Sequence, residues 1–299
     1  MNEERKGMLA SGAAYSIFGL SYLFSTMGIG VTGDPIILLS IRFAVTFLAL
    51  NVLVFTRMMK LELKGKNILG PLLLGILNPV MYFLFENYGL KFTSTAFAGM
   101  VSSVNPIFTA ILGAVMLRER PTARQWLFIC ISIAGVMMVS LGANEGRNTL
   151  FGCVCLLTAY FTGSLNCIFV RRLTKKFSAF ELTYLAFCAG FAGFAVLPFI
   201  KYGGNAAGLL TAALSSGKFV ISVLYLGLLA SVGAYMLSNY ALARLPVARM
   251  AIFSSCSTVI SVLSGVIIMH DEFPLINVLA FVLMLAGVWG VNHYERPAA

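Results

Sequence analysis

Apolar residues run through this chain in ten long blocks, and the short segments between them hold most of the charged and turn-forming residues. The blocks are Met8–Ile29, Ile36–Phe55, Ile68–Phe85, Ala96–Leu117, Trp126–Leu141, Leu150–Val170, Phe180–Ile200, Phe219–Leu242, Met250–Met269 and Leu275–Val291. A helix needs roughly 20 apolar residues to cross the hydrocarbon layer of a membrane. The pattern therefore predicts ten membrane-spanning helices, with no room left for a soluble domain.

The composition supports an all-α polytopic membrane protein. Hydrophobic residues make up 59% of the chain and charged residues 11%, whereas a soluble domain is about one quarter charged. A chain of this kind has too few polar residues to cover a surface that faces water. The bilayer is therefore its expected surroundings, and we place it in the plasma (cytoplasmic) membrane.

The net charge is +10, and the Lys and Arg residues are distributed unevenly between the two sides of the predicted membrane. With ten spans, 16 of the 21 Lys and Arg residues fall on the side of the two termini and four on the other side. Positive residues favour the cytoplasmic side of a membrane. The charge thus predicts that both termini are cytoplasmic, and it is a topology signal rather than a nucleic-acid site.

The two halves of the chain resemble each other. The segment "NYGLKFTSTAFAGMVSSV" from Asn87 aligns with "NYALARLPVARMAIFSSC" from Asn239, a shift of 152 residues. We interpret residues 1–143 and 149–294 as two five-helix repeats. A repeat with an odd number of spans inserts its second copy upside down, as in secondary transporters that bind substrate between their repeats. The prediction is two inverted repeats around a central cavity.

The segment "MLRERPTARQWLFICISIAGVMMVSLG" ends the first half, and a looser version, "MHDEFPLINVLAFVLMLAGVWGV", ends the second. Together with Arg42 early in the second span, they resemble the EamA family of the drug/metabolite transporter superfamily. The resemblance covers the whole chain and implies a carrier, mainly an exporter, of small metabolites. It also implies a cavity walled by spans 1–4 and 6–9, with spans 5 and 10 mostly structural.

Polar residues recur at helical spacing inside the spans, which predicts helix faces that border a cavity. The candidate substrate-binding residues are Tyr15, Asn78, Tyr82, Ser102, Asn105, Tyr160, Ser164, Tyr235, Ser254 and Ser257. The alternative is that small hydroxyl residues only join neighbouring helices. Asn78, Asn105, Tyr82 and Tyr235 favour the cavity, because amides and phenols deep in a bilayer need partners or water.

Two Asn–Pro pairs, 78–79 and 105–106, lie inside spans and predict bends in those helices, because proline removes a backbone hydrogen bond. Each bend is either a hinge or a static kink. The Gly- and Ala-rich segment 201–218 is expected to be a plain connector, with a short interfacial helix as the alternative.

Arg42 and Glu86 are the charged residues expected within the membrane. An unpaired charge there costs about 3 kcal/mol or more. We expect Arg42 to be a structural cation that pairs with Glu86 or reaches outward, and Asp34 is the alternative partner. The competing interpretation is that Arg42 attracts an anionic group of the substrate. Proton coupling through Glu86 stays open.

These features favour a secondary transporter of small metabolites, such as amino acids or amphipathic organic molecules, that works by alternating access. An uncoupled facilitator or channel-like protein is the alternative, and a third is an intramembrane enzyme, whose signatures the sequence lacks. Phosphate-bearing substrates are disfavoured because Arg42 alone supplies positive charge within a span. No metal, cofactor or nucleic acid is expected, only a small-molecule substrate and the lipid bilayer, for a monomer or weak dimer.

Overall fold

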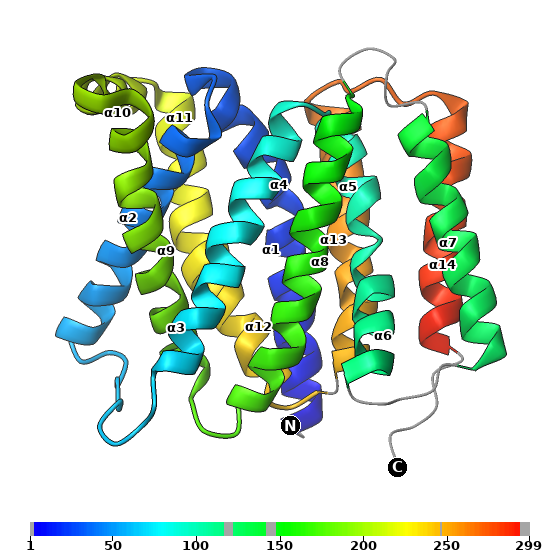
Figure 1. Cartoon of the computed structure of the whole chain (residues 1–299), viewed down its shortest axis with the longest axis horizontal. Helices are drawn as coiled ribbons and strands as arrows, with labels where there is room; N and C mark the ends of the chain where they lie inside the picture. The colour runs from blue at the N-terminus through cyan, green and yellow to red at the C-terminus, as the bar shows by residue number, and fades with distance from the viewer. Residues whose placement is uncertain (1–2, 117–121, 142–147, 246, 294–299) are drawn as a thin grey trace.

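The computed structural model describes residues 3–116, 122–141, 148–245 and 247–293, and within these ranges the chain forms helices and no strands (Figure 1). The unbroken long helices are α1 (Glu3–Thr32), α2 (Pro35–Phe55), α7 (Ala123–Leu141), α8 (Leu150–Leu173), α9 (Ala179–Tyr202), α13 (Val247–Ile268) and α14 (Leu275–His293). The turn 119–121 in the first copy of the repeated motif lies outside the described residues.

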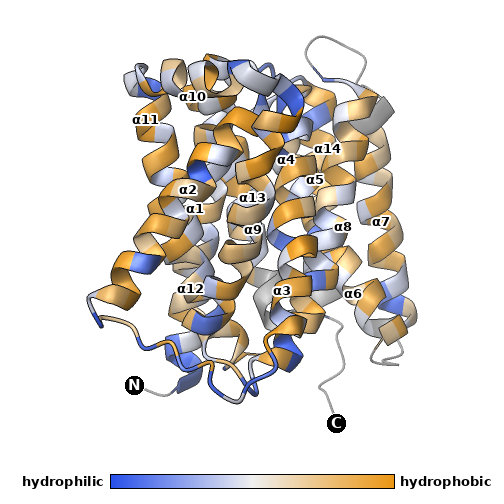
Figure 2. Cartoon of the chain, turned by 60° about the vertical axis from the view of Figure 1, so that its left-hand side comes forward, coloured by the Kyte–Doolittle hydropathy of each residue, from blue (hydrophilic) through white to orange (hydrophobic). Residues whose placement is uncertain are grey.

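Seven helical segments are long and apolar enough to cross a membrane, among the described residues. They are Glu3–Thr32, Pro35–Phe55, Leu69–Lys91, Thr95–Gly113, Leu150–Leu173, Ala179–Leu214 and Gly217–Leu242. Shorter apolar helices cover Ala123–Met138, Phe253–Ile268 and Leu275–Gly290, where the sequence predicts further spans. The colour of hydrophobic residues dominates the bundle in Figure 2, and segments coloured as hydrophilic gather toward its lower end. The chain is therefore a multi-pass membrane protein.

Two segments change helix type within a span. The first comprises α3 (Leu69–Gly75), a π-helical turn η1 (Ile76–Met81) and α4 (Tyr82–Lys91). Asn78 has extended backbone angles, φ −146° and ψ 112°, as expected for a residue that precedes proline. The second comprises α11 (Gly217–Leu224), the π-helical η4 (Tyr225–Ala234) and α12 (Tyr235–Leu242). A shift of 152 residues places η1 inside η4.

The other Asn–Pro pair also interrupts a helix. The chain leaves the helix at residues 103–104, between α5 (Thr95–Ser102) and α6 (Asn105–Met116), just before the pair Asn105–Pro106. The prediction of interruptions at both Asn–Pro pairs is therefore confirmed.

The helices pack in a pattern that is similar in the two halves (Figure 1). Helix α1 lies against α11, η4, α12 and α13, and α8 lies correspondingly against α3, η1, α4, α5 and α6. Pairs α2 with α9, and α5 with α13, join the halves, while α7 and α14 form a pair at the edge. Helices α1 and α8 begin at opposite ends of the bundle.

The segment 201–218 is not a plain connector. It contains a short helix, α10 (Ala206–Leu214), which packs on the ends of α2, α9 and α11. Leu210 and Ala213 of α10 pack in the main hydrophobic core. This burial stabilises a short helix whose neighbouring segment is rich in Gly.

Helix α9 begins with a reciprocal cap. Ser178 Oγ accepts a bond from the backbone N–H of Glu181 at 3.2 Å, and the Glu181 carboxylate accepts one from the N–H of Ser178 at 2.8 Å. Glu181 is 2% exposed and also binds Lys66 Nζ at 2.7 Å, so the cap ties the 56–68 loop to α9.

We expect Ser178→Ala to lower the free energy of unfolding by about 1 kcal/mol, because the first turn of α9 loses a side-chain acceptor. Ser216→Ala is the matched control, since Ser216 occupies the same position before α11 but makes no capping bond. Denaturation of both variants in mixed micelles checks this, and equal effects of the two substitutions would contradict it.

Candidate functional site

A cavity of about 160 Å³ lies between the helices of the two halves. It borders α1, α2, η1, α4, α5, α6, α8, α12 and α13, so it draws on both halves of the chain. Its wall includes Arg42 and Glu86 and reaches Val170 and Leu242, near the ends of α8 and α12. The cavity thus extends toward the end of the bundle at which α1 begins.

The structure brings most of the predicted side chains to this cavity. Its wall contains Tyr15, Asn78, Tyr82, Ser102, Asn105, Ser164, Tyr235, Ser254 and Ser257, together with Arg42 and Glu86. These nine candidates come from six spans, and two pairs of them, Ser102 with Ser254 and Asn105 with Ser257, are related by the shift of 152 residues between the halves. Whether these residues bind a substrate remains a prediction.

Several of these polar groups bond across helix boundaries. Tyr235 donates its hydroxyl to Asn78 Oδ1 at 2.8 Å, which links α12 to η1. Ser164 Oγ donates to the carbonyl oxygen of Asn105 at 3.1 Å, and Ser102 Oγ lies 3.0 Å from Thr258 Oγ1. The two serines therefore join helices as well as border the cavity.

Tyr160 departs from the expectation, because it does not border the cavity. The side chain is fully buried, and its hydroxyl donates to the carbonyl oxygen of Ala98 at 3.0 Å. Its ring centroid lies 6.5 Å from that of Tyr82. Tyr160 thus supports the cavity wall from within the core, where a phenol needs one acceptor.

Arg42 does not pair with Glu86 or with Asp34, so the expected ion pair is wrong. Its Nε donates to Ser231 Oγ at 3.1 Å, and its guanidinium carbon lies 4.0 Å from the centre of the Phe83 ring. The side chain is 1% exposed. An aromatic face and a hydroxyl hold this cation, because no carboxylate among the described residues lies within 4.0 Å of it.

Glu86 is also held by a neutral partner. Its Oε1 accepts a hydrogen bond from the Tyr82 hydroxyl at 2.7 Å, and the residue is 5% exposed. Tyr82 lies four residues earlier on α4, so both side chains occupy one face of that helix. The cavity therefore contains one buried cation and one buried carboxylate that do not touch.

The sequence reasoning missed Asn166, which borders the cavity from α8. Its Oδ1 is buried and has no hydrogen-bond partner among the described residues. The signal was present, since Asn166 is an amide inside an apolar block like Asn78 and Asn105. Asn166 was not selected because it does not lie three or four residues from the candidates chosen on that helix, Tyr160 and Ser164. Phe18 and Ser21, on α1, are further wall residues that the helical-spacing argument did not select.

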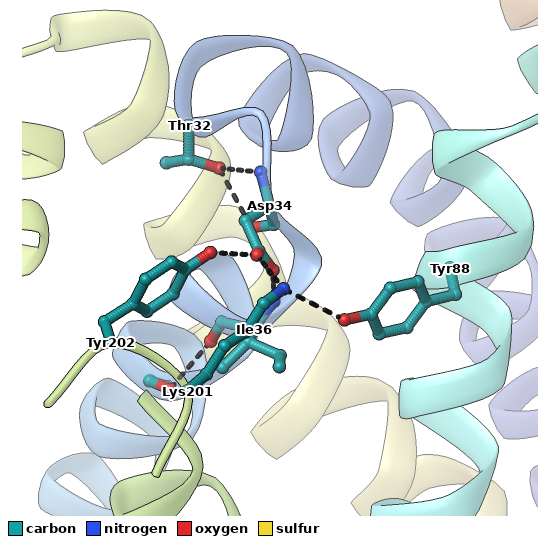
Figure 3. Close-up of polar contacts among 7 residues, drawn as sticks. Thr32, Asp34, Ile36, Tyr88, Lys201 and Tyr202 are labelled. Atoms are coloured by element: carbon teal, nitrogen blue, oxygen red, sulfur yellow. Dashed lines mark hydrogen bonds and ion pairs between the residues drawn. The ribbon is translucent and has the colours of Figure 1, made fainter. Parts of the chain in front are cut away.

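Asp34, which precedes α2, closes the other end of the bundle (Figure 3). Its carboxylate accepts hydrogen bonds from Lys201 Nζ, the Tyr202 hydroxyl and the backbone N–H of Ile36, the last at 2.7 Å. Lys201 also donates to the Tyr88 hydroxyl at 3.3 Å. Burial opposes ionisation, but these donors outweigh it and lower the pKa of the Asp34 carboxyl.

Among the described residues, no group of three or more His, Cys, Asp or Glu side chains could hold a metal ion. The cavity presents one guanidinium, one carboxylate, amides, phenols and hydroxyls on an otherwise apolar wall. Such mixed walls are typical of sites for small organic molecules.

A comparison with known proteins identifies the family of this chain. The model of the EamA-like transporter family matches residues 5–141 and again residues 150–293. The chain belongs to the EamA-like transporter family. Proteins of this family are transporters of the drug/metabolite type, so the sequence-based assignment to EamA is confirmed.

Relatives of this EamA-like transporter include the uncharacterized transporter YcxC of Bacillus subtilis, 30% identical over 92% of this chain and 89% of that one. A probable terminal-alkyne amino-acid exporter of Streptantibioticus cattleyicolor is 24% identical over 71% of this chain and 68% of its own. A solved crystal structure, 19% identical, matches 95% of both chains with a TM-score of 0.67 and shows the same fold.

Proposed function

We propose that this EamA-like transporter is a secondary carrier of small metabolites, such as amino acids or amphipathic organic molecules, and that it exports them. The observation that carries the proposal is the polar-lined cavity between the two halves of the chain. The relative named as a probable amino-acid exporter supports the substrate class and the direction.

Alternating access is the mechanism that the packing supports. We propose ten crossings arranged as two inverted five-helix repeats, 1–143 and 149–294, with both termini cytoplasmic. The similar contacts of α1 and α8, which begin at opposite ends, are those expected when one repeat is the inverse of the other. The two π-helical segments, η1 and η4, occupy equivalent positions and are suited to bend as the halves rock.

In this arrangement the structure represents the state that is open toward the cytoplasm. The cavity extends toward the beginning of α1, and the Asp34 network joins α2, α4 and α9 at the opposite end. Export would then begin with substrate entering this cavity, followed by release of the network and exit on the far side.

The test is efflux from liposomes that contain the purified protein and a mixture of amino acids and small organic acids. We expect selective, saturable release, reduced at least about tenfold in Asn105→Leu and Tyr82→Leu, because an amide or phenol in the cavity wall is lost and its shape changes. Asn205→Leu, in an exposed turn, is the control and should release at the wild-type rate.

Release equal to that of protein-free liposomes for every compound would contradict the carrier proposal. Linear, non-saturable release would favour the uncoupled facilitator. An imposed pH gradient that accelerates wild-type release but not release by Glu86→Gln would identify Glu86 as a proton site.

A further inference from the structure

Two loops at the lower end of the bundle in Figure 1 fold against each other. The 56–68 loop joins α2 to α3, and residues 174–178 join α8 to α9. The Lys66 ammonium group lies 2.7 Å from a Glu181 carboxylate oxygen and 5.4 Å from the centre of the Phe177 ring. Phe177 belongs to a small buried apolar cluster against which side chains of the 56–68 loop also pack. The two loops therefore share one folded surface.

This surface is strongly basic. Residues 57–66 and 171–176 contain eight of the 21 Lys and Arg residues of the chain and one carboxylate, Glu62. Lys66 and Arg171 are occupied, because they bind a carboxylate of α9 and a backbone carbonyl oxygen. The other six cations are exposed and have no hydrogen-bond or ion-pair partner in the described part of the chain: Arg57, Lys60, Lys64, Arg172, Lys175 and Lys176. We call these six residues the two-loop surface.

The topology of the chain explains only part of this arrangement. The preference of positive residues for the cytoplasmic side requires that they lie on that side. It does not require that they gather on one surface, where like charges repel one another. The two-loop surface carries six positive charges, and Glu62 is the one exposed carboxylate of its two segments. An anionic partner would relieve this repulsion.

Exposed apolar side chains lie beside these cations. Phe55, the last residue of α2, is 91% exposed, and Met58, which follows Arg57, is 72% exposed. Leu69, the first residue of α3, is also exposed. Both helices belong to membrane spans, so these side chains lie where the hydrocarbon layer ends. The cations next to them are therefore at the level of the lipid headgroups.

We infer that the two-loop surface binds the headgroups of anionic phospholipids, with the acyl chains beside Phe55 and Met58. Such a lipid joins a negative phosphate to apolar chains, and it therefore matches cations that border exposed apolar side chains. A nucleic acid or an acidic soluble protein would match the charge alone. The surface lies outside the central cavity, and the inference does not depend on the substrate or the direction of transport proposed above.

The test compares two lipids with the same acyl chains. Palmitoyl-oleoyl phosphatidylglycerol carries a net negative charge, and palmitoyl-oleoyl phosphatidylcholine has none. In native mass spectrometry of the whole chain, we expect phosphatidylglycerol to bind at least about tenfold more tightly. The preference should fall as the ionic strength rises, because salt screens exposed charges. Equal binding of the two lipids by the wild-type protein would overturn the inference, and this comparison requires no variant to fold.

Charge reversals locate the binding surface. The double variant Lys64→Glu with Lys175→Glu reverses one exposed cation in each loop. Its control is Lys91→Glu with Lys218→Glu, at the end of α4 and the beginning of α11, on the opposite end of the bundle. Each pair lowers the net charge of the chain by four, from +10 to +6. We expect the first pair to reduce the preference for phosphatidylglycerol to within about threefold and the control to retain it. Equal losses in the two double variants would reject the two-loop surface in favour of a response to total charge.

A competition experiment separates a lipid from a soluble phosphate compound. Glycerol 3-phosphate presents the same phosphate group without acyl chains. In excess, it should leave phosphatidylglycerol bound, because it makes no contact with the exposed apolar side chains. Displacement of the lipid by glycerol 3-phosphate would contradict the inference and assign the surface to soluble phosphate compounds.

Discussion

Gly265→Ala is expected to lower the free energy of unfolding by about 2–4 kcal/mol, the largest effect that we predict for a single methyl group. A Cβ atom at Gly265 of α13 would lie 2.5 Å from the backbone nitrogen of Ala96 and 2.7 Å from Asp271 Oδ2. These two atoms form a hydrogen bond of 2.8 Å that caps α5. The added methyl group would therefore separate α5 from α13 and break the bond, since backbone atoms cannot rotate away.

Gly30→Ala is the matched control for that substitution. Gly30 lies in α1, and a Cβ atom there would have no neighbour within 4 Å. Alanine also favours a helix over glycine by roughly 1 kcal/mol, so this variant should be as stable as the wild type or slightly more stable. Denaturation in mixed micelles measures both. Equal losses would show that α5 and α13 do not approach as closely as we describe.

Asp34→Asn is expected to lower the free energy of unfolding by about 2 kcal/mol at neutral pH, because three donors lose a charged acceptor. The carboxylate is 9% exposed, whereas the Lys201 side chain is 38% exposed. Solvent screens the ammonium group, and we therefore place the effect below that of a fully buried pair. Glu62→Gln, in an exposed position, should leave stability unchanged.

The effect of Asp34→Asn should also depend on pH. The pKa of Asp34 lies below its ordinary value of 3.8 in the folded protein. Its stabilisation is thus fully present above pH 3.8 and is lost as the pH falls through the lower, folded-state pKa. The difference in stability between wild type and variant should be constant at neutral pH and shrink in strong acid. A difference that instead grew in acid would contradict the direction of this pKa shift.

The same substitution tests the conformational role of the network. If Asp34 holds α2, α4 and α9 together on the closed side, its loss should shift the population toward the state open on that side. We expect a cysteine introduced at Ile36 to react faster with a membrane-impermeant thiol reagent in the Asp34→Asn background. An unchanged rate would confine Asp34 to a role in stability.

The sequence by itself determined the helical, membrane-embedded class. Blocks such as Ile36–Phe55 are long enough and apolar enough to leave no other solution, because an exposed backbone cannot be solvated in lipid. It also located the bends, since Asn78 and Pro79 restrict each other's backbone locally. Family membership could likewise be recognised, through a repeat that spans the whole chain.

Most of the candidate cavity residues could be selected by helical spacing, because every third or fourth residue of a span shares a face. Asn166 was missed because it lies off the spacing chosen on its helix, and Tyr160 was assigned to the cavity although it does not border it. Spacing finds the polar face of one helix, but it does not say whether a neighbouring helix covers that face. The packing of α8 against α4, α5 and α6 makes that decision.

Only the tertiary structure decided what each charge meets. Arg42 lies at a depth comparable with that of Glu86, and depth alone suggested an ion pair. The rotation of η4 against α2 instead brings Ser231 to Arg42, and α4 turns Phe83 toward the guanidinium. Asp34 likewise meets Lys201 from a helix 167 residues away. Partners of this kind depend on the relative rotation of helices, which no local pattern along the chain encodes.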